Sequence, residues 1–214
     1  MMKKRNGASF FIGVALLAGF VVWTLLVCFI DVAAIGPRES SIGFAKLNGY
    51  VHNLTGVNMT LYKITDWLGL VPFGVALGFA LFGFIQLIKR KSFFKVDRTI
   101  LYLGGFYIIV IAVYIFFEKI IINYRPVLID GYLEVSYPSS TTMLTASVMP
   151  SAAIELNSRI KNIILRRIVI ATAAAFTAFM VIGRLISGVH WFTDIIGGIL
   201  FSSGAVLIYR FVCT

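Results

Sequence analysis

Three ionisable side chains lie within a short stretch between two apolar runs near the end of the chain. Five residues separate Arg184 from His190, and three separate His190 from Asp194. Charge among apolar segments is expensive and is usually retained for function. If the chain is helical from Trp191 onward, His190 and Asp194 share a face, and the carboxylate can accept the proton of one imidazole nitrogen. The other nitrogen would then face a substrate, as in a nucleophilic or basic histidine.

Arg184 extends this pattern toward an anionic substrate. Ser187 and Gly188 interrupt the expected helix, which lets Arg184 turn toward the same point as His190. A guanidinium fork matches the oxygens of phosphate, so phosphate is the anion that this pattern indicates. A second interpretation stays open: Arg184 and Asp194 form a structural ion pair, and His190 is a satisfied residue between helices.

The composition places these residues in a membrane protein. Of 214 residues, 59% are hydrophobic and 13% are charged, which is far from the mixture of a soluble domain. We predict an all-α, polytopic membrane protein, a six-transmembrane-helix bundle that forms a single domain over residues 1–214. The expected spans are Ala8 to Ile30, Trp67 to Ile88, Thr99 to Phe117, Thr142 to Leu156, Ile168 to Ile186, and Trp191 to Phe211.

Two further segments matter for this organisation. Asp31 to Asp66 reads as a long polar connection, with an amphipathic part from Ile42 to Leu54 that is expected to lie on the membrane surface. Cys28 and Cys213 show no paired spacing. They therefore indicate neither a disulfide framework nor a metal site.

The basic residues predict the orientation. With six spans, 13 of the 19 Lys and Arg residues fall on the side of the two termini, and the positive-inside rule makes that side cytoplasmic. The net charge of +10 then reflects orientation and contact with anionic lipid, and no nucleic-acid partner is expected. The stretch from Arg184 to Asp194 would face outward from the cell membrane.

Two more polar clusters fall on the same outer side. Lys119 and Arg125 close the third span, and Pro126 fixes a turn directly after the arginine. Both cations could instead snorkel to the interface at a helix end. The second cluster, Pro138-Ser139-Ser140-Thr141, opens the fourth span. A hydroxyl run at a helix start offers backbone N–H groups, hydroxyl donors and the positive end of the helix dipole, which together suit an anion.

In this order the clusters resemble the three-part signature of the type 2 phosphatidic acid phosphatase superfamily, integral membrane enzymes that dephosphorylate lipid phosphates and diphosphates. The resemblance implies that His190 is the nucleophile and that Asp194 orients it. It implies no metal and no cofactor. The implied phosphate-binding residues are Lys119, Arg125, Ser139, Ser140, Thr141 and Arg184.

The chain departs from the family pattern at two important places. The family lysine usually stands seven positions before its Arg-Pro, where this chain has Glu118, so Lys119 is one place late and would point about 100° away on a straight helix. The second motif commonly reads Pro-Ser-Gly-His, and here Ser140 and Thr141 replace the glycine and the histidine. That histidine normally protonates the leaving group, and a threonine cannot do so near neutral pH.

Three consequences are open. A lipid diphosphate, such as an isoprenoid diphosphate, releases a stable phosphate anion that needs no proton. Alternatively, Glu118, Asp130 or Glu134 supplies the proton. The chain could also be catalytically impaired. The expected function is thus a membrane lipid phosphatase or diphosphatase with a phosphohistidine intermediate, and the alternatives are a lipid phosphotransferase and a lipid-binding or transport protein.

Overall fold

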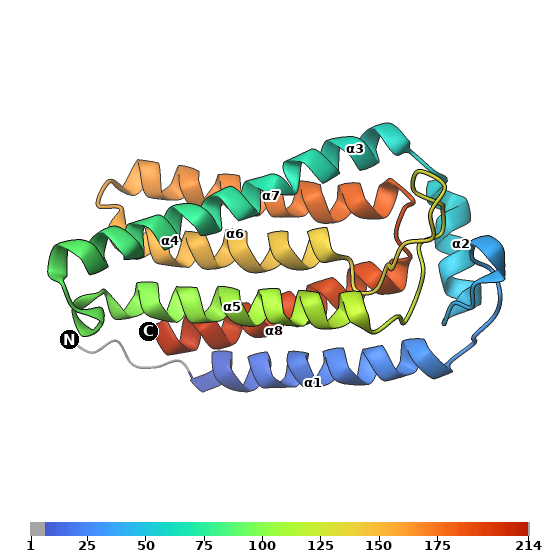
Figure 1. Cartoon of the computed structure of the whole chain (residues 1–214), viewed down its shortest axis with the longest axis horizontal. Coiled ribbons are helices and arrows are strands. Elements are labelled where there is room, and N and C mark those ends of the chain that lie inside the picture. Colours follow the sequence, from blue (N-terminus) through green and yellow to red (C-terminus); the bar gives the residue numbers. More distant parts are fainter. Residues whose placement is uncertain (1–6, 214) are drawn as a thin grey trace.

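The computed structural model describes residues 7–213, and it is all-α (Figure 1). No strand occurs in that range. The basic start, Lys3 to Arg5, lies outside the described residues. The helices are α1 (Gly7–Phe29), α2 (Ala45–Thr55), α3 (Met59–Leu68), α4 (Leu70–Arg90), α5 (Arg98–Lys119), α6 (Ser140–Arg159), α7 (Ile163–Ile186) and α8 (Phe192–Cys213), with short 3-10 turns at Pro37–Glu39 and Phe93–Lys95.

The predicted all-α membrane fold is confirmed, and the predicted count of six spans is close. Within residues 7–213, five segments are long and apolar enough to cross a membrane: α1, α3 with α4, α5, α7 and α8. The sixth long helix, α6, packs against α4, α5, α7 and α8. Its Thr142, Thr145, Ser147 and Ser151 are buried. α6 is less apolar than its neighbours, and the bundle accommodates it because these polar groups face neighbouring helices and not lipid.

The second span begins earlier than predicted. Met59–Arg90 forms one candidate span, broken at Gly69 between α3 and α4, so the last part of the expected polar connection is helical. The Asn58 side chain caps α3 by accepting from Leu61 N–H at 2.9 Å. α3 packs on α7, where a Cβ at Gly183 would lie 2.8 Å from Thr65 Cγ2. Glycine at position 183 therefore leaves room for Thr65 at this crossing.

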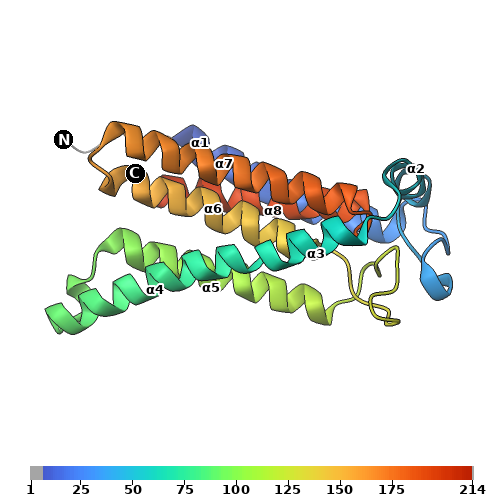
Figure 2. The ribbon, with the colours of Figure 1, turned by 90° about the horizontal axis from the view of Figure 1, so that it is seen from above.

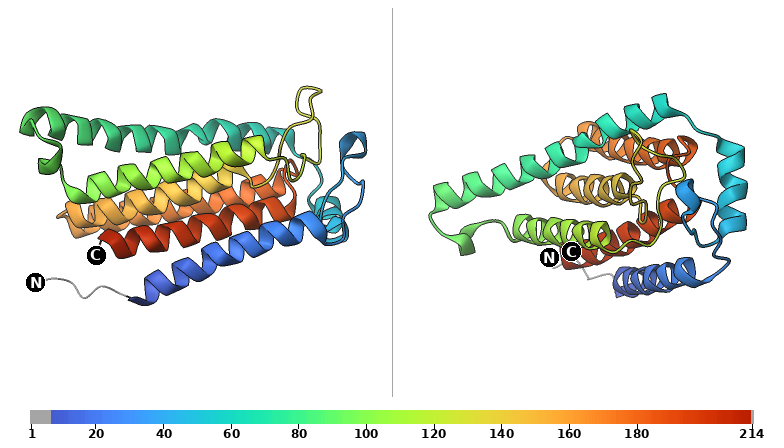
Figure 3. Two further views of the ribbon diagram at one scale, coloured as in Figure 1. Left: turned by 60° about the horizontal axis from the view of Figure 1, so that its bottom comes forward. Right: turned by 45° about the vertical axis from the view of Figure 1, so that its right-hand side comes forward.

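Helix α2 lies across one end of the bundle (Figure 3, right). It covers much of the segment predicted to be amphipathic, but it is also tied to the protein. The buried Asn48 side chain donates to Thr193 Oγ1 at 3.0 Å and accepts from Thr193 N–H at 3.2 Å. This pair caps the start of α8 and fixes the end of the bundle that holds the predicted site.

Aromatic packing positions the segment before α6. α1 runs along α8 (Figure 3, left), and Phe20 of α1 stacks with Tyr137, their ring centroids 6.4 Å apart. The Tyr137 hydroxyl lies 2.7 Å from Thr24 Oγ1. A Cβ at Gly197 would lie 2.8 Å from the Tyr137 ring. The glycine in α8 thus makes room for Tyr137, which holds the hydroxyl run beside the start of α8.

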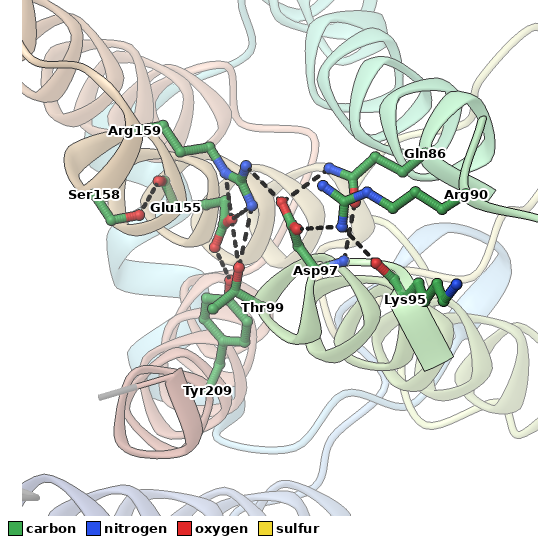
Figure 4. Close-up of polar contacts among 9 residues, drawn as sticks. All are labelled: Gln86, Arg90, Lys95, Asp97, Thr99, Glu155, Ser158, Arg159 and Tyr209. Atoms are coloured by element: carbon green, nitrogen blue, oxygen red, sulfur yellow. Dashed lines mark hydrogen bonds and ion pairs between the residues drawn. The ribbon is translucent and has the colours of Figure 1, made fainter. Parts of the chain in front are cut away.

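The opposite end of the bundle carries a network of charges, which we call the far-end cluster (Figure 4). Its members are Gln86, Arg90, Asp97, Thr99, Glu155, Arg159 and Tyr209. Asp97 pairs with Arg90 at 2.8 Å and with Arg159 at 3.1 Å. Hydrogen bonds, led by the one from Arg90, lower the pKa of Asp97 to about 2. The cluster joins α4, α5, α6 and α8 where their ends meet.

Candidate active site

His190 lies in the tight turn between α7 and α8. Gly188 in this turn has φ +67°, and a Cβ there would lie 1.8 Å from the carbonyl oxygen of Gly56. The Asn58 N–H donates to the carbonyl oxygen of Ser187 at 2.9 Å. Only glycine fits position 188 on both counts. The turn presses against the start of α3 and leaves His190 buried, with 3% of its surface exposed.

The imidazole reaches Asp194 through a serine. His190 Nδ1 lies 3.0 Å from Ser136 Oγ, and Ser136 Oγ donates to Asp194 Oδ2 at 2.5 Å. The direct distance from Nδ1 to Asp194 Oδ2 is 3.7 Å, too long for a hydrogen bond. The carboxylate predicted to orient the imidazole is therefore in place, but it acts across the Ser136 hydroxyl.

Hydrogen-bond chemistry assigns the tautomer of His190. Arg125 Nη1 lies 3.3 Å from Nε2, and a guanidinium can only donate. Nε2 must therefore be the acceptor, so a neutral ring carries its proton on Nδ1. Nδ1–H then donates a hydrogen bond to Ser136 Oγ. This agrees with the Ser136 hydroxyl donating its own hydrogen bond to Asp194. The Nε2 lone pair faces the arginine side of the site.

Asp194 is itself held by several donors. Its Oδ2 accepts from the Trp191 N–H at 2.9 Å, and its Oδ1 accepts from Asn123 Nδ2 at 3.3 Å. Its carbonyl oxygen accepts from the Ser139 N–H at 3.1 Å. The carboxylate thus caps α8 and anchors both the segment before α6 and the segment after α5.

Arg125 is positioned by a fold-back of the chain between α5 and α6. Its backbone N–H donates to the Glu134 carbonyl oxygen at 3.0 Å, and its Nε lies 3.0 Å from Glu134 Oε2. One residue earlier, the Tyr124 carbonyl oxygen accepts from Trp191 Nε1 at 2.7 Å. The predicted constraint on Arg125 thus comes from these contacts in addition to Pro126.

Arg184 and Arg125 both lie near the ring of Tyr62. Its guanidinium carbon lies 4.9 Å from the centre of the Tyr62 ring, and that of Arg125 lies 5.8 Å from the same centre. Arg184 has 1% of its surface exposed, and its ion-pair partner is Asp66 at 3.4 Å. The alternative pairing of Arg184 with Asp194 is wrong. Two guanidinium groups instead converge around Tyr62 near His190.

Glu118, not Lys119, borders the space beside the imidazole. A cavity of about 10 Å³, room for about one water molecule, is lined by Glu118, Ser136, Ser140 and His190 among others. Lys119 ends α5 with an exposed side chain. Since consecutive helix residues point about 100° apart, Lys119 turns away where Glu118 turns inward. The structure does not bring the predicted lysine to this cavity.

The hydroxyl run divides among three directions. Ser140 faces the cavity beside His190. Ser139 is buried, and among residues 7–213 its Oγ has no hydrogen-bond partner. Its backbone N–H donates to the carbonyl oxygen of Asp194. Thr141 packs its methyl group toward Gly69, where an added Cβ would lie 3.4 Å from Cγ2. The predicted anion cradle is thus reduced to Ser140, the Ser139 hydroxyl and the free N–H groups of the first helical turn.

Burial and positive charge keep His190 neutral. Desolvation, followed by the charges of Arg125 and Arg184, lowers the pKa of His190 well below its ordinary value of 6.5. Across residues 7–213, no three His, Cys, Asp or Glu side chains gather as a metal site would require. The arrangement places a neutral imidazole nitrogen beside two cations that the fold holds in place, which suits chemistry on an anionic group such as phosphate.

This lowered pKa predicts the acid limb of the pH profile. Protonation removes the Nε2 lone pair, so kcat/KM for phosphate release should stay level down to pH 6.5 and fall only below it. The measurement is kcat/KM over a pH series, with the ionisation of the substrate followed by phosphorus NMR as a control. A half-maximal point above 6.5 that the substrate does not explain would contradict the assignment.

Sequence reasoning missed four residues of the site: Asn123, Ser136, Tyr62 and Asp66. Ser136 stands three positions before Ser139 and Asn123 two before Arg125, so both are near predicted motifs. Their polarity beside apolar spans was the available signal. Tyr62 and Asp66 lie in the segment read as a polar connection, and no spacing pointed to them.

Comparison with known proteins agrees with this geometry. The sequence profile of the PAP2 superfamily, the type 2 phosphatidic acid phosphatases, matches residues 123–213. This region contains every predicted site residue except Lys119, and the match confirms the resemblance predicted from the three motifs.

Among solved structures, the chain is similar to the first transmembrane PAP2 type phosphatidylglycerolphosphate phosphatase from Bacillus subtilis. The TM-score is 0.53 at 20% sequence identity, with 94% of each chain covered. At this identity the likeness is one of fold: the chain has the membrane fold of a PAP2-type protein. No curated protein matches the chain.

Proposed function

We propose that the chain is an integral membrane phosphatase that hydrolyses a lipid diphosphate or monophosphate through a phosphohistidine at His190. The observation that carries the proposal is the neutral Nε2 of His190, which lies 3.3 Å from Arg125, while Arg184 and Arg125 both lie near the ring of Tyr62. The PAP2 profile match over the same residues supports it, as does the phosphatase named for the similar fold.

In the first step, a phosphate group enters between the two arginines. It accepts the hydrogen bond that Arg125 otherwise donates to Nε2. Nε2 attacks phosphorus, and the bond from phosphorus to the leaving oxygen breaks. The ring becomes positive as the P–N bond forms, and the hydrogen-bond chain through Ser136 to Asp194 stabilises that charge. The guanidinium groups stabilise the charge that develops on the phosphoryl oxygens.

In the second step, water attacks the phosphorus of the phosphohistidine. The P–N bond breaks, which restores the Nε2 lone pair and releases inorganic phosphate. If an alcohol took the place of water, the enzyme would be a phosphotransferase. A phosphate-release assay with a labelled donor separates these two outcomes.

The absence of an evident proton donor for the leaving group favours a lipid diphosphate, such as an isoprenoid diphosphate, as the substrate. Thr141 cannot protonate an alkoxide, and its methyl group faces Gly69. Of the acids considered as replacements, Glu134 is paired with Arg125, and Asp130 does not line the cavity beside His190. Glu118 lines the cavity with His190 and is the remaining candidate. A departing monophosphate needs no proton, so a diphosphate avoids the difficulty.

A panel of matched lipids tests the preference for a diphosphate over a monophosphate. With equal chains, the diphosphate should be hydrolysed at least about 100-fold faster than the monophosphate, which is the lower range of what a general acid contributes. Thr141→His should raise monophosphate hydrolysis more than diphosphate hydrolysis. Equal rates on the two lipids would contradict the leaving-group argument, and no phosphate release from any lipid would favour a binding or transport protein.

We further propose that the site faces outward from the cell membrane and that both termini are cytoplasmic. The basic loops after α4 and α6 support this orientation through the positive-inside rule. The same assay tests it in intact cells with a short-chain, water-soluble diphosphate. Phosphate released without permeabilisation is the expected result, and release only after permeabilisation would contradict the orientation.

A further inference from the structure

A second, much larger cavity, open to the surface of the bundle, lies between α6, α7 and α8. Its volume is about 1330 Å³, above the roughly 300–1,000 Å³ of most small-molecule sites. Small side chains such as Ala153, Ala174 and Ala178 open its walls. A short turn joins α7 and α8 (Figure 2), and residues of both helices beyond that turn line the cavity. His190 is not among its lining residues, so this cavity is separate from the candidate active site.

The cavity has one apolar end and one polar end. Ala146, Val181 and Ile199 line it toward the active site, and Glu155, Ser158 and Arg210 line it toward the far end. Ala146 and Ser158 are about 18 Å apart along α6, at 1.5 Å for each residue. An amphiphile with its head group at the far end and its chains toward the middle of the bundle matches this gradient. A substrate with its phosphate at His190 would place its head group at the wrong end.

The charge at the polar end is positive. Glu155 is already paired with Arg159 at 2.6 Å within the far-end cluster (Figure 4). Beside this end, Lys161 lies just before α7, and Arg166 and Arg167 lie in its first turns. None of the three lines the cavity itself, and no ion pair within residues 7–213 uses them. Arg166 is four positions before Ile170, a wall residue, so the two share a helix face. Basic pockets between membrane helices on the cytoplasmic side bind anionic lipid head groups.

We propose that this cavity is a second lipid site, which holds one anionic phospholipid of the inner leaflet. Its chains lie between α6, α7 and α8, and its phosphate lies against Arg166, Arg167 and Lys161. The site goes beyond the proposed phosphatase activity and does not depend on it. The lipid in this site is a bound component of the bundle and not a substrate, and its head group lies at the opposite end from His190.

Native mass spectrometry of the full chain tests the head-group preference. The protein is purified from membranes exchanged into equal parts phosphatidylglycerol and phosphatidylcholine. One phosphatidylglycerol should stay bound to each chain in preference to phosphatidylcholine. The double variant Arg166→Gln, Arg167→Gln should reduce that preference by about tenfold or more, since each cation near a lipid head group contributes several-fold. Lys89→Gln with Lys91→Gln removes the same charge from the other basic loop and should leave the preference unchanged.

A second variant tests the cavity itself. Ala174 and Ala178 are one turn apart on the wall, and replacing both with phenylalanine should remove the bound lipid whatever its head group. Thermal unfolding in detergent should stay cooperative in this variant and reports that the bundle is folded. Equal retention of both lipids by the wild-type chain would overturn the proposal. So would a wild-type dimer that these phenylalanines disrupt, because a second copy would then cover the cavity.

Discussion

His190→Ala is expected to lower phosphate release by at least about 10³-fold, as loss of a covalent nucleophile does. Its Nε2 is the nitrogen nucleophile of the proposed reaction, and no other histidine lies at the site within residues 7–213. The imidazole also accepts from Arg125, so its loss should alter phosphate binding as well. The measurement is kcat on the preferred lipid diphosphate, with thermal unfolding in detergent as the check on folding.

The other histidine of the chain provides a matched control. His52 lies on α2, with its ring centre 5.5 Å from that of Trp191, and it makes no contact with the proposed nucleophile in the described structure. His52→Ala should keep most of the activity. If His190→Ala hydrolysed every lipid of the panel at near the wild-type rate, the phosphohistidine mechanism would be wrong.

Ser136→Ala is expected to lower kcat by about 10²-fold with a smaller change in KM. Ser136 is a positioning residue, because it joins Nδ1 of His190 at 3.0 Å to Asp194 at 2.5 Å. Without its hydroxyl the direct gap of 3.7 Å remains. The charge on the ring in the transition state would then lose its path to the carboxylate, whereas phosphate binding by the arginines would persist.

Two further variants separate this role from a structural one. Ser136→Thr keeps the hydroxyl and should restore much of kcat. Ser151→Ala removes an equally buried hydroxyl about 16 Å farther along α6 from Ser140 and should leave kcat unchanged. If Ser136→Ala raised KM and left kcat intact, or if threonine failed to rescue while the protein stayed folded, the positioning role would be contradicted.

The parts of the site that could be predicted are those with a fixed spacing on one helix or turn. Arg184, His190 and Asp194 are close in sequence, so helical geometry alone places them near one another. Arg125 was identifiable because an Arg-Pro pair at a helix end is unusual between apolar runs. The membrane fold followed from apolar segments long enough to span a bilayer, which depends on composition and not on tertiary contacts.

The parts that could not be predicted depend on contacts between distant segments. Ser136 bridges His190 and Asp194 only because the chain folds back between α5 and α6. Tyr62 and Asp66 meet Arg184 because α3 crosses α7 at Gly183. The segment from Met59 looked polar because Lys63 and Asp66 stand in it, although one face of the helix packs against α7. Periodicity over a short window does not reveal such a crossing.

The same limit applies to the two departures from the family pattern. A shift of one residue on a helix changes the direction of a side chain by about 100°, and the structure turns Glu118 and not Lys119 toward the cavity. Thr141 follows Ser140 by one position and turns toward Gly69. Sequence spacing showed that Lys119 and Thr141 depart from the family pattern. Their positions on the helices then determine that Glu118 and Ser140 border the imidazole.

The central claim is that His190 takes the phosphoryl group. The most direct test is to quench a reaction with lipid diphosphate labelled at its terminal phosphorus, digest the protein and map the label. The account predicts an alkali-stable, acid-labile label on the peptide that contains residue 190, formed within the first turnover and absent from His190→Ala. Label on another residue, or full turnover with no phosphorylated protein at any time, would contradict it.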